Sequence, residues 1–384
     1  MKDTNHFDYI IIGNGLAGLK LALSLTQDPF FESKTIALID PSDKTLNDKT
    51  WSYWEKGIGK WDHLLLKSWK TATFKSHHLS LSIPLEDYTY KTIRALDFYS
   101  WSIKKLKSKK RIHFINDTVK TVSDTKIPIV SGYKNTYTAT HVFDSRISPD
   151  FYLDSKKHTT IQQHFRGYVI ESEQAFFKDD CFTMMDYRFQ YKDTTSFIYM
   201  LPYSEHHALI EFTFFSSETV ANNVYNDAIK KYIKTELQLT NYTVIETECG
   251  NIPMTDFSFK NGHTASITKI GTAGGWVKAS SGYAFKATEK YVSKIVDNLK
   301  NNQRPSQNLY QKKFQFYDTI FLNVLKHNNE KGPWIFERFY SKNSIKNMFE
   351  FLDEDSNIFQ DLAIIGSLFS TAFIKALFRV LFRR

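Results

Sequence analysis

The sequence has few cysteines and no histidine pattern typical of a metal site. Only two cysteines, Cys181 and Cys249, occur in 384 residues, and they lie too far apart to form a CxxC pair. We therefore expect reduced thiols in a cytoplasmic protein rather than a disulfide framework. The 12 histidines form no HExxH or comparable ligand set, so we expect no metal.

Long apolar runs and long basic runs are also missing. The uncharged stretch Leu362–Ile374 is shorter than the roughly 20 residues of a membrane span, and the run Tyr9–Ile12 is too short for a signal peptide. Lys and Arg outnumber Asp and Glu by 50 to 41, but no basic run exceeds Lys109–Arg111. Without a zinc-finger or RNA-recognition pattern, nucleic acid is not an expected partner. Anionic lipid or a phosphate-bearing cofactor remain as explanations of the positive charge.

Glycines, in contrast, are concentrated in an informative place. Gly13, Gly15 and Gly18 follow the apolar run Asp8–Ile12 and open a predicted helix at Leu16–Gln27. This GxGxxG arrangement permits a tight turn, lets the backbone approach a pyrophosphate, and allows close packing of helix on strand. Asp40 ends the next predicted strand, 22 residues beyond Gly18, where a carboxylate can accept hydrogen bonds from a ribose.

A second glycine-rich turn favours FAD over NAD, which the first motif alone does not separate. Gly271, Thr272 and Ala273 lie between a predicted strand and a helix that begins near Tyr283. A second turn facing phosphate suits an extended FAD. The two turns predict a Rossmann-like cofactor domain made of residues 1–155 and 261–300.

The intervening residues have a different pattern. From 156 to 260 alternating apolar and polar stretches dominate, interrupted by one amphipathic helix at Glu218–Leu237, and they predict a second domain built on an antiparallel sheet. Residues 301–384 are predicted to be helical. The fold class is thus α/β with an α+β second domain, and the aromatic content of 16% provides side chains for a core or for a long apolar cavity.

The order of eight short motifs resembles the bacterial flavoprotein-type lycopene β-cyclase family. The motifs are Ile11–Gly18, Thr50–Tyr53, Val142–Arg146, Gln162–Phe165, Tyr199–Pro202, Ala208–Thr213, Ile252–Thr255 and Ile270–Gly274. The resemblance implies a fold like that of the aromatic-hydroxylase flavoproteins. It also implies isomerisation of the linear ψ-ends of lycopene and related acyclic carotenoids to β-rings, with reduced FAD and with NAD(P)H as the reductant. Thr272 stands where the wider flavoprotein class has an acid.

The resemblance also points to residues of a substrate site. The family's acid aligns with Glu211, which we expect to hold a proton for donation because an apolar cavity raises the pKa of a carboxyl group. Trp51 and Tyr53 either wall the cavity and stabilise a cation through their π faces or pack in the core. His164 is either a polar anchor of the substrate site or a hydrogen-bonded core histidine.

The end of the chain predicts contact with a membrane surface. Apolar residues from Leu362 to Leu381 recur at helical spacing, and Lys375, Arg379, Arg383 and Arg384 are basic. A basic amphipathic helix of this kind lies in the membrane interface, which would place a cytoplasmic protein on the inner face of the cell membrane. The alternative is an ordinary terminal helix docked on the body of the protein.

Three other functions fit parts of the sequence. A flavin monooxygenase acting on an aromatic or prenyl substrate has the same expected fold, but it consumes NAD(P)H and oxygen stoichiometrically. An ε-cyclase or a monocyclase differs only in the proton lost or in the number of ends that react. A non-catalytic carotenoid or lipid carrier needs neither the glycine motif nor Glu211.

Overall fold

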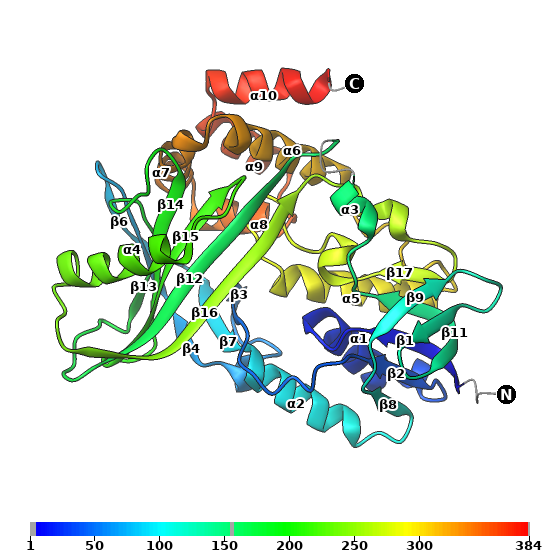
Figure 1. The fold of residues 1–384 in the computed structure, drawn as a ribbon. Helices are drawn as coiled ribbons and strands as arrows, with labels where there is room; N and C mark the ends of the chain where they lie inside the picture. Colours follow the sequence, from blue (N-terminus) through cyan, green and yellow to red (C-terminus); the bar gives the residue numbers. More distant parts are fainter. Residues whose placement is uncertain (1–4, 154–156, 383–384) are drawn as a thin grey trace.

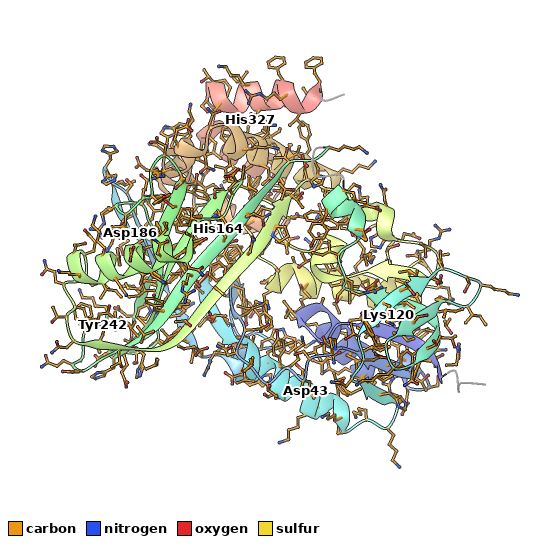
Figure 2. All side chains as sticks on the ribbon, in the orientation of Figure 1. Asp43, Lys120, His164, Asp186, Tyr242 and His327 are labelled. Atoms are coloured by element: carbon orange, nitrogen blue, oxygen red, sulfur yellow. The ribbon has the colours of Figure 1, made fainter. Side chains whose placement is uncertain are left out.

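The computed structural model describes residues 5–153 and 157–382 and contains two large sheets, one small sheet and a group of C-terminal helices (Figure 1). The sheet of the predicted Rossmann-like domain lies on one side of the molecule, and the sheet of the predicted second domain lies on the other (Figure 1). In Figure 2, the labelled Asp43 and Lys120 lie on the side of the first of these sheets. The labelled His164, Asp186 and Tyr242 lie on the side of the second.

The first sheet contains the predicted βαβ unit. Its strand order is β8-β2-β1-β11-β10-β9, and β17 pairs with β11. The strands are β1 (Asn5–Ile12), β2 (Ile36–Ile39), β8 (Ile112–Ile115), β9 (Val119–Ser123), β10 (Ile129–Gly132), β11 (Thr136–Asp144) and β17 (Ile267–Lys269). Strands β8, β2, β1, β11 and β17 are parallel, and the side chains of β2 are all buried, as expected of a strand covered on both faces.

Two helices pack together beside this sheet. α1 (Leu16–Gln27) has the bounds that the sequence predicts, and it packs against α5 (Phe285–Lys300). The sequence of residues 111–144 also predicts a meander of short strands, which is only partly present. Its first strand, β8, joins the parallel sheet beside β2, because its partner is distant in sequence and no local pattern reveals it.

The second sheet is mostly antiparallel and has the order β16-β12-β15-β14-β13-β5-β6. Its strands are β5 (Thr71–Lys75), β6 (Ser80–Pro84), β12 (Thr160–Ser172), β13 (Cys181–Asp186), β14 (Thr195–Pro202), β15 (His207–Ser216) and β16 (Tyr242–Thr255). β5 and β6 come from the segment assigned by sequence to the cofactor domain, so that assignment needs revision. α4 (Asn222–Thr235) covers one face of this sheet with Ile229 and Ile233.

A small sheet and the helix that follows it connect the two large sheets. The strands β3 (Thr50–Lys56), β4 (Lys67–Trp69) and β7 (Tyr88–Arg94) pair in the order β3-β7-β4, and α2 (Ala95–Lys107) follows β7 directly. α3 (Pro149–Leu153) lies ahead of β12. The sequence pattern also predicts a helix over residues 95–108, and α2 confirms it.

The C-terminal region is helical, as predicted, but its last segment is not one continuous helix. It contains α6 (Lys312–His327), α7 (Gly332–Lys342), α8 (Ile345–Leu352), α9 (Ile358–Ser367) and α10 (Thr371–Leu381). Apolar residues keep their helical spacing from Leu362 to Leu381, but the helix itself is interrupted at Leu368–Ser370. α10 follows this interruption and lies at the edge of the molecule (Figure 1). Within residues 5–153 and 157–382, no helix has the length and apolarity needed to cross a membrane.

Candidate active site

One cavity of about 760 Å³ extends from the glycine turns to the C-terminal helices. Gly13 and Gly15 lie at one end, Glu211 lines the middle, and Phe373 and Leu377 of α10 line the other end. Its volume falls within the roughly 300–1,000 Å³ typical of small-molecule sites. The cavity brings together residues from both halves of the chain.

The first glycine motif has the geometry of a pyrophosphate-binding turn. Gly13 has a φ of +100°, which only glycine adopts readily, and a Cβ atom at Gly18 would lie 2.0 Å from the carbonyl oxygen of Gly13. A Cβ atom at Gly15, in contrast, would meet no protein atom within 4 Å. The side-chain Oδ1 of Asn14 is buried and has no hydrogen-bond partner among the residues that the structure describes. The turn thus combines an open backbone with a free buried polar atom, and these features fit FAD.

The other predicted cofactor residues have different surroundings. Gly271 and Thr272 line the same cavity, whereas Ala273 is buried beside them. The Asp40 carboxylate is buried and accepts hydrogen bonds from the backbone amides of Asn14, at 2.6 Å, and Ser42, at 2.8 Å. Asp40 therefore fixes the glycine turn in addition to any contact with a ribose.

Glu211 lies in β15 with its side chain in the cavity and 7% exposed. Burial raises the pKa of the Glu211 carboxyl group well above its usual value, and a hydrogen bond and charge repulsion from Glu248 raise it further. This environment favours the protonated form of the carboxyl group. That Glu211 holds a proton for donation stays a prediction, and its buried position in the cavity is compatible with it.

The two predicted aromatic wall residues face different cavities. Trp51 lines the large cavity and packs edge-on against Phe98. Tyr53 is buried, stacks on Phe285 with ring centroids 4.5 Å apart, and lines an adjacent cavity of about 570 Å³. Tyr53 therefore contributes mainly to packing beside the large cavity.

The structure places His164 in the core behind the sheet rather than in the cavity lining. Its ring Nε2 lies 2.8 Å from the Ser216 hydroxyl group and its Nδ1 lies 2.6 Å from that of Tyr225, which belongs to α4. Side chains along a strand alternate between its faces. The neighbour Gln163 consequently points into the cavity, where its Oε1 has no hydrogen-bond partner in the described part of the chain.

Three tyrosines that the sequence analysis did not select lie beside Glu211. The hydroxyl group of Tyr90 is 2.9 Å from that of Tyr199 and 2.9 Å from that of Tyr283, and all three residues line the cavity. Burial raises the pKa of each hydroxyl group, so the rings stay neutral. Tyr199 was present in a family motif, but its contact with residues from β7 and from the turn before α5 depends on the tertiary fold.

The comparison with protein families decides the affiliation of the chain. The family described as lycopene cyclase protein matches residues 8–378. The chain belongs to the lycopene cyclase family. The motif-based resemblance is therefore confirmed over nearly the whole sequence. A search of curated proteins finds no match.

Solved structures confirm the flavoprotein fold. A flavoprotein/dehydrogenase from Cytophaga hutchinsonii matches with a TM-score of 0.62 and 9% identity, covering 99% of this chain and 100% of that chain. A geranylgeranyl bacteriochlorophyll reductase-like protein from Thermoplasma acidophilum matches with a TM-score of 0.60, 9% identity and coverage of 99% and 100%. A flavin-dependent brominase matches with a TM-score of 0.56, 10% identity and coverage of 98% for both chains. At these identities the likeness concerns the fold alone.

The described residues give no indication of a metal centre. Among residues 5–153 and 157–382, no group of three or more His, Cys, Asp or Glu side chains is arranged to hold a metal ion.

Proposed function

We propose that this member of the lycopene cyclase family is a lycopene β-cyclase, which converts the ψ-ends of lycopene to β-rings, forming γ-carotene and then β-carotene. The observation that carries the proposal is Glu211, a buried carboxyl group with a raised pKa in a cavity that is mostly apolar. A hydrocarbon substrate offers no groups for hydrogen bonding, and its protonation requires a carboxyl group that keeps its proton in a site without water.

The proposed reaction begins with proton transfer from Glu211 to the terminal double bond. This step forms a C–H bond and leaves a tertiary cation, which the next double bond attacks to close the ring. A neighbouring C–H bond then breaks, and its proton returns to the carboxylate. No electrons are gained or lost overall, and the reaction is an isomerisation of the intramolecular lyase type.

The walls of the cavity support the cation. The rings of Tyr90, Tyr199 and Tyr283 offer neutral π faces beside Glu211, and a cation within about 6 Å of such a face is stabilised. Phe197 and Phe215 add apolar surface that excludes water. Water exclusion matters because water would capture the cation as an alcohol.

FAD is the proposed cofactor, with NAD(P)H as its reductant. Gly13, Gly15 and Gly18 at the start of α1 would hold the pyrophosphate, and Gly271 and Thr272 would face the cofactor from the second turn. Reduced FAD would supply negative charge beside the developing cation.

Expression in a host that accumulates lycopene tests this function. We expect the extracted pigments to include β-carotene, identified by chromatography, because both ends of lycopene are equivalent substrates. Unchanged lycopene alongside soluble, FAD-loaded protein would contradict the proposal. Stoichiometric consumption of NAD(P)H and oxygen would instead indicate a monooxygenase.

A membrane surface is the proposed source of the substrate. Phe359, Phe369, Phe378 and Phe382 of the α9–α10 region are between 56% and 80% exposed. Lys375 and Arg379 lie exposed on α10, and Arg383 and Arg384 fall outside the described residues. Because Phe369 and Phe373 also line the cavity, the exposed apolar surface is continuous with the site. This arrangement suits a cytoplasmic protein bound to the inner face of the cell membrane.

Vesicle binding tests this surface. We expect the Phe378→Ser/Leu381→Ser double variant to bind anionic vesicles about tenfold or more weakly than the unchanged protein, because two apolar side chains that would be buried are lost. Sedimentation with vesicles measures the effect. Ile127→Ser, which alters an equally exposed residue between β9 and β10, is the matched control. Equal binding by the double variant and the control would contradict the proposal.

A further inference from the structure

Glu211 has a second buried carboxyl group beside it. Gly167 of β12 pairs directly with Glu211 of β15 on one side and with Glu248 of β16 on the other. Directly paired residues of antiparallel strands point to the same face of a sheet. Both glutamates accordingly line the large cavity.

The absence of a side chain at Gly167 brings the two glutamates together. A Cβ atom at this position would lie 2.7 Å from Cγ of Glu211 and 3.4 Å from Cγ of Glu248. The first distance is shorter than van der Waals contact allows. The two side chains therefore extend over the space above Gly167, and any larger residue would force them apart.

The pair is buried without a balancing cation. Glu211 is 7% exposed and Glu248 is 8% exposed. In the described part of the chain neither forms an ion pair, whereas Glu246, two residues before Glu248, binds Arg94 at 3.0 Å. Two adjacent carboxyl groups in such a place do not both ionise readily, so one proton is shared between them.

A hydroxyl group decides which of the two glutamates holds the shared proton. Thr50 of β3 donates a hydrogen bond of 2.7 Å to Oε2 of Glu248. A hydrogen bond donated to a carboxylate stabilises its charged form, so Glu248 is the member of the pair that holds the negative charge. The proton is therefore held on Glu211 and points toward Glu248.

We propose that Glu248 is a positioning residue that keeps Glu211 protonated and orients its O–H group for donation, an inference that rests on the proposed cyclisation. The pair contains one proton before the reaction. Glu211 transfers it to the substrate carbon, and the proton released from the ring carbon restores it. The pair thus ends each turnover in its starting state, without a net exchange of protons or electrons.

The other titratable groups that face the pair do not interfere near neutral pH. Tyr90, Tyr199, Tyr203 and Tyr283 all have pKa values raised by burial and stay neutral. Glu246 is paired with Arg94. A change of activity or of carboxyl signal near neutral pH therefore reports on Glu211.

The principal test compares Glu248→Gln with Glu246→Gln in the FAD-loaded protein. Glu248→Gln removes the charge that opposes ionisation of Glu211, so the alkaline limb of the kcat profile should move to lower pH by about one unit or more. Glu246→Gln should leave the limb in place. A uniform loss of activity in Glu248→Gln without a displaced limb would indicate a merely structural role and would overturn the proposal.

A spectroscopic readout separates this proposal from the proposed function. We expect an infrared carbonyl band of a protonated carboxyl group at neutral pH, absent from Glu211→Gln and titrating at lower pH in Glu248→Gln. This result supports the pair even if lycopene is not the substrate. A band that titrates identically in the wild type and in Glu248→Gln would overturn the pair, whatever the substrate.

A third variant tests the space above Gly167 that the two glutamates occupy. Gly167→Ala should lower kcat at least about tenfold, because its Cβ atom displaces the Glu211 side chain from its position. Gly366→Ala, whose Cβ atom would meet nothing within 4 Å, is the control. Full activity of folded Gly167→Ala would contradict the requirement that the Glu211 and Glu248 side chains lie close together.

Discussion

Glu211→Gln should lose cyclisation activity by a factor of about 10² to 10⁴ while the protein remains folded and binds FAD. The amide has nearly the shape of the protonated carboxyl group, and it still donates a hydrogen bond to Glu248. It does not, however, release a proton to a double bond. Turnover of lycopene by purified protein, followed by chromatography of the pigments, measures the loss.

Thermal unfolding at neutral pH provides the control for this variant. Burial and Glu248 raise the pKa of Glu211 in the folded protein, so between its unfolded and folded pKa values the folded state binds more protons. Stability from this group therefore falls as the pH rises through that interval. Glu211→Gln removes the effect, and we expect an equal or higher Tm. A lower Tm together with lost activity would mean that Glu211 is structural.

Gly15→Ala and Gly18→Ala should affect FAD binding in different ways. The Cβ atom of Gly15→Ala meets no protein atom, so the apo protein should keep its Tm while the new methyl group occupies the approach of the pyrophosphate. The Cβ atom of Gly18→Ala would lie 2.0 Å from a backbone carbonyl oxygen, so this variant should lose both FAD binding and stability.

The ratio of bound FAD to protein and the Tm of the apo protein measure these two effects. We expect FAD affinity to fall at least about tenfold in Gly15→Ala, since poor contact at one phosphate costs more than about 1.4 kcal/mol. Normal FAD content in Gly15→Ala would exclude this turn as the cofactor site. An unchanged Tm in Gly18→Ala would contradict the close packing of α1 on β1.

Local patterns were sufficient to predict the βαβ unit at the start of the cofactor half. The bounds of α1 agree with the prediction because an apolar strand, three glycines and a stop at Asp28-Pro29 are all encoded within one continuous segment. Glu211 was selected because a family motif contains it. These features depend on residues adjacent in sequence, which a single sequence displays directly.

Features that depend on partners distant in sequence were not predicted. The role proposed for Glu248 depends on the pairing of Gly167 in β12 with Glu211 on one side and with Glu248 on the other. The spacing of these residues along the chain does not reveal this pairing. For the same reason the segment of β5 and β6 was assigned to the cofactor domain, although both strands belong to the second sheet. His164 and Gln163 are adjacent residues of one strand, and only the observed register shows which of them faces the cavity.

The central claim is that an enzyme acid closes the ring without net redox change, and an anaerobic reaction tests it most directly. Protein with its FAD reduced once would be mixed with excess lycopene in vesicles, without oxygen, and the products quantified by chromatography. The account predicts many molecules of β-carotene for each FAD, and none with Glu211→Gln. Product limited to one molecule per FAD, or a requirement for oxygen, would contradict it.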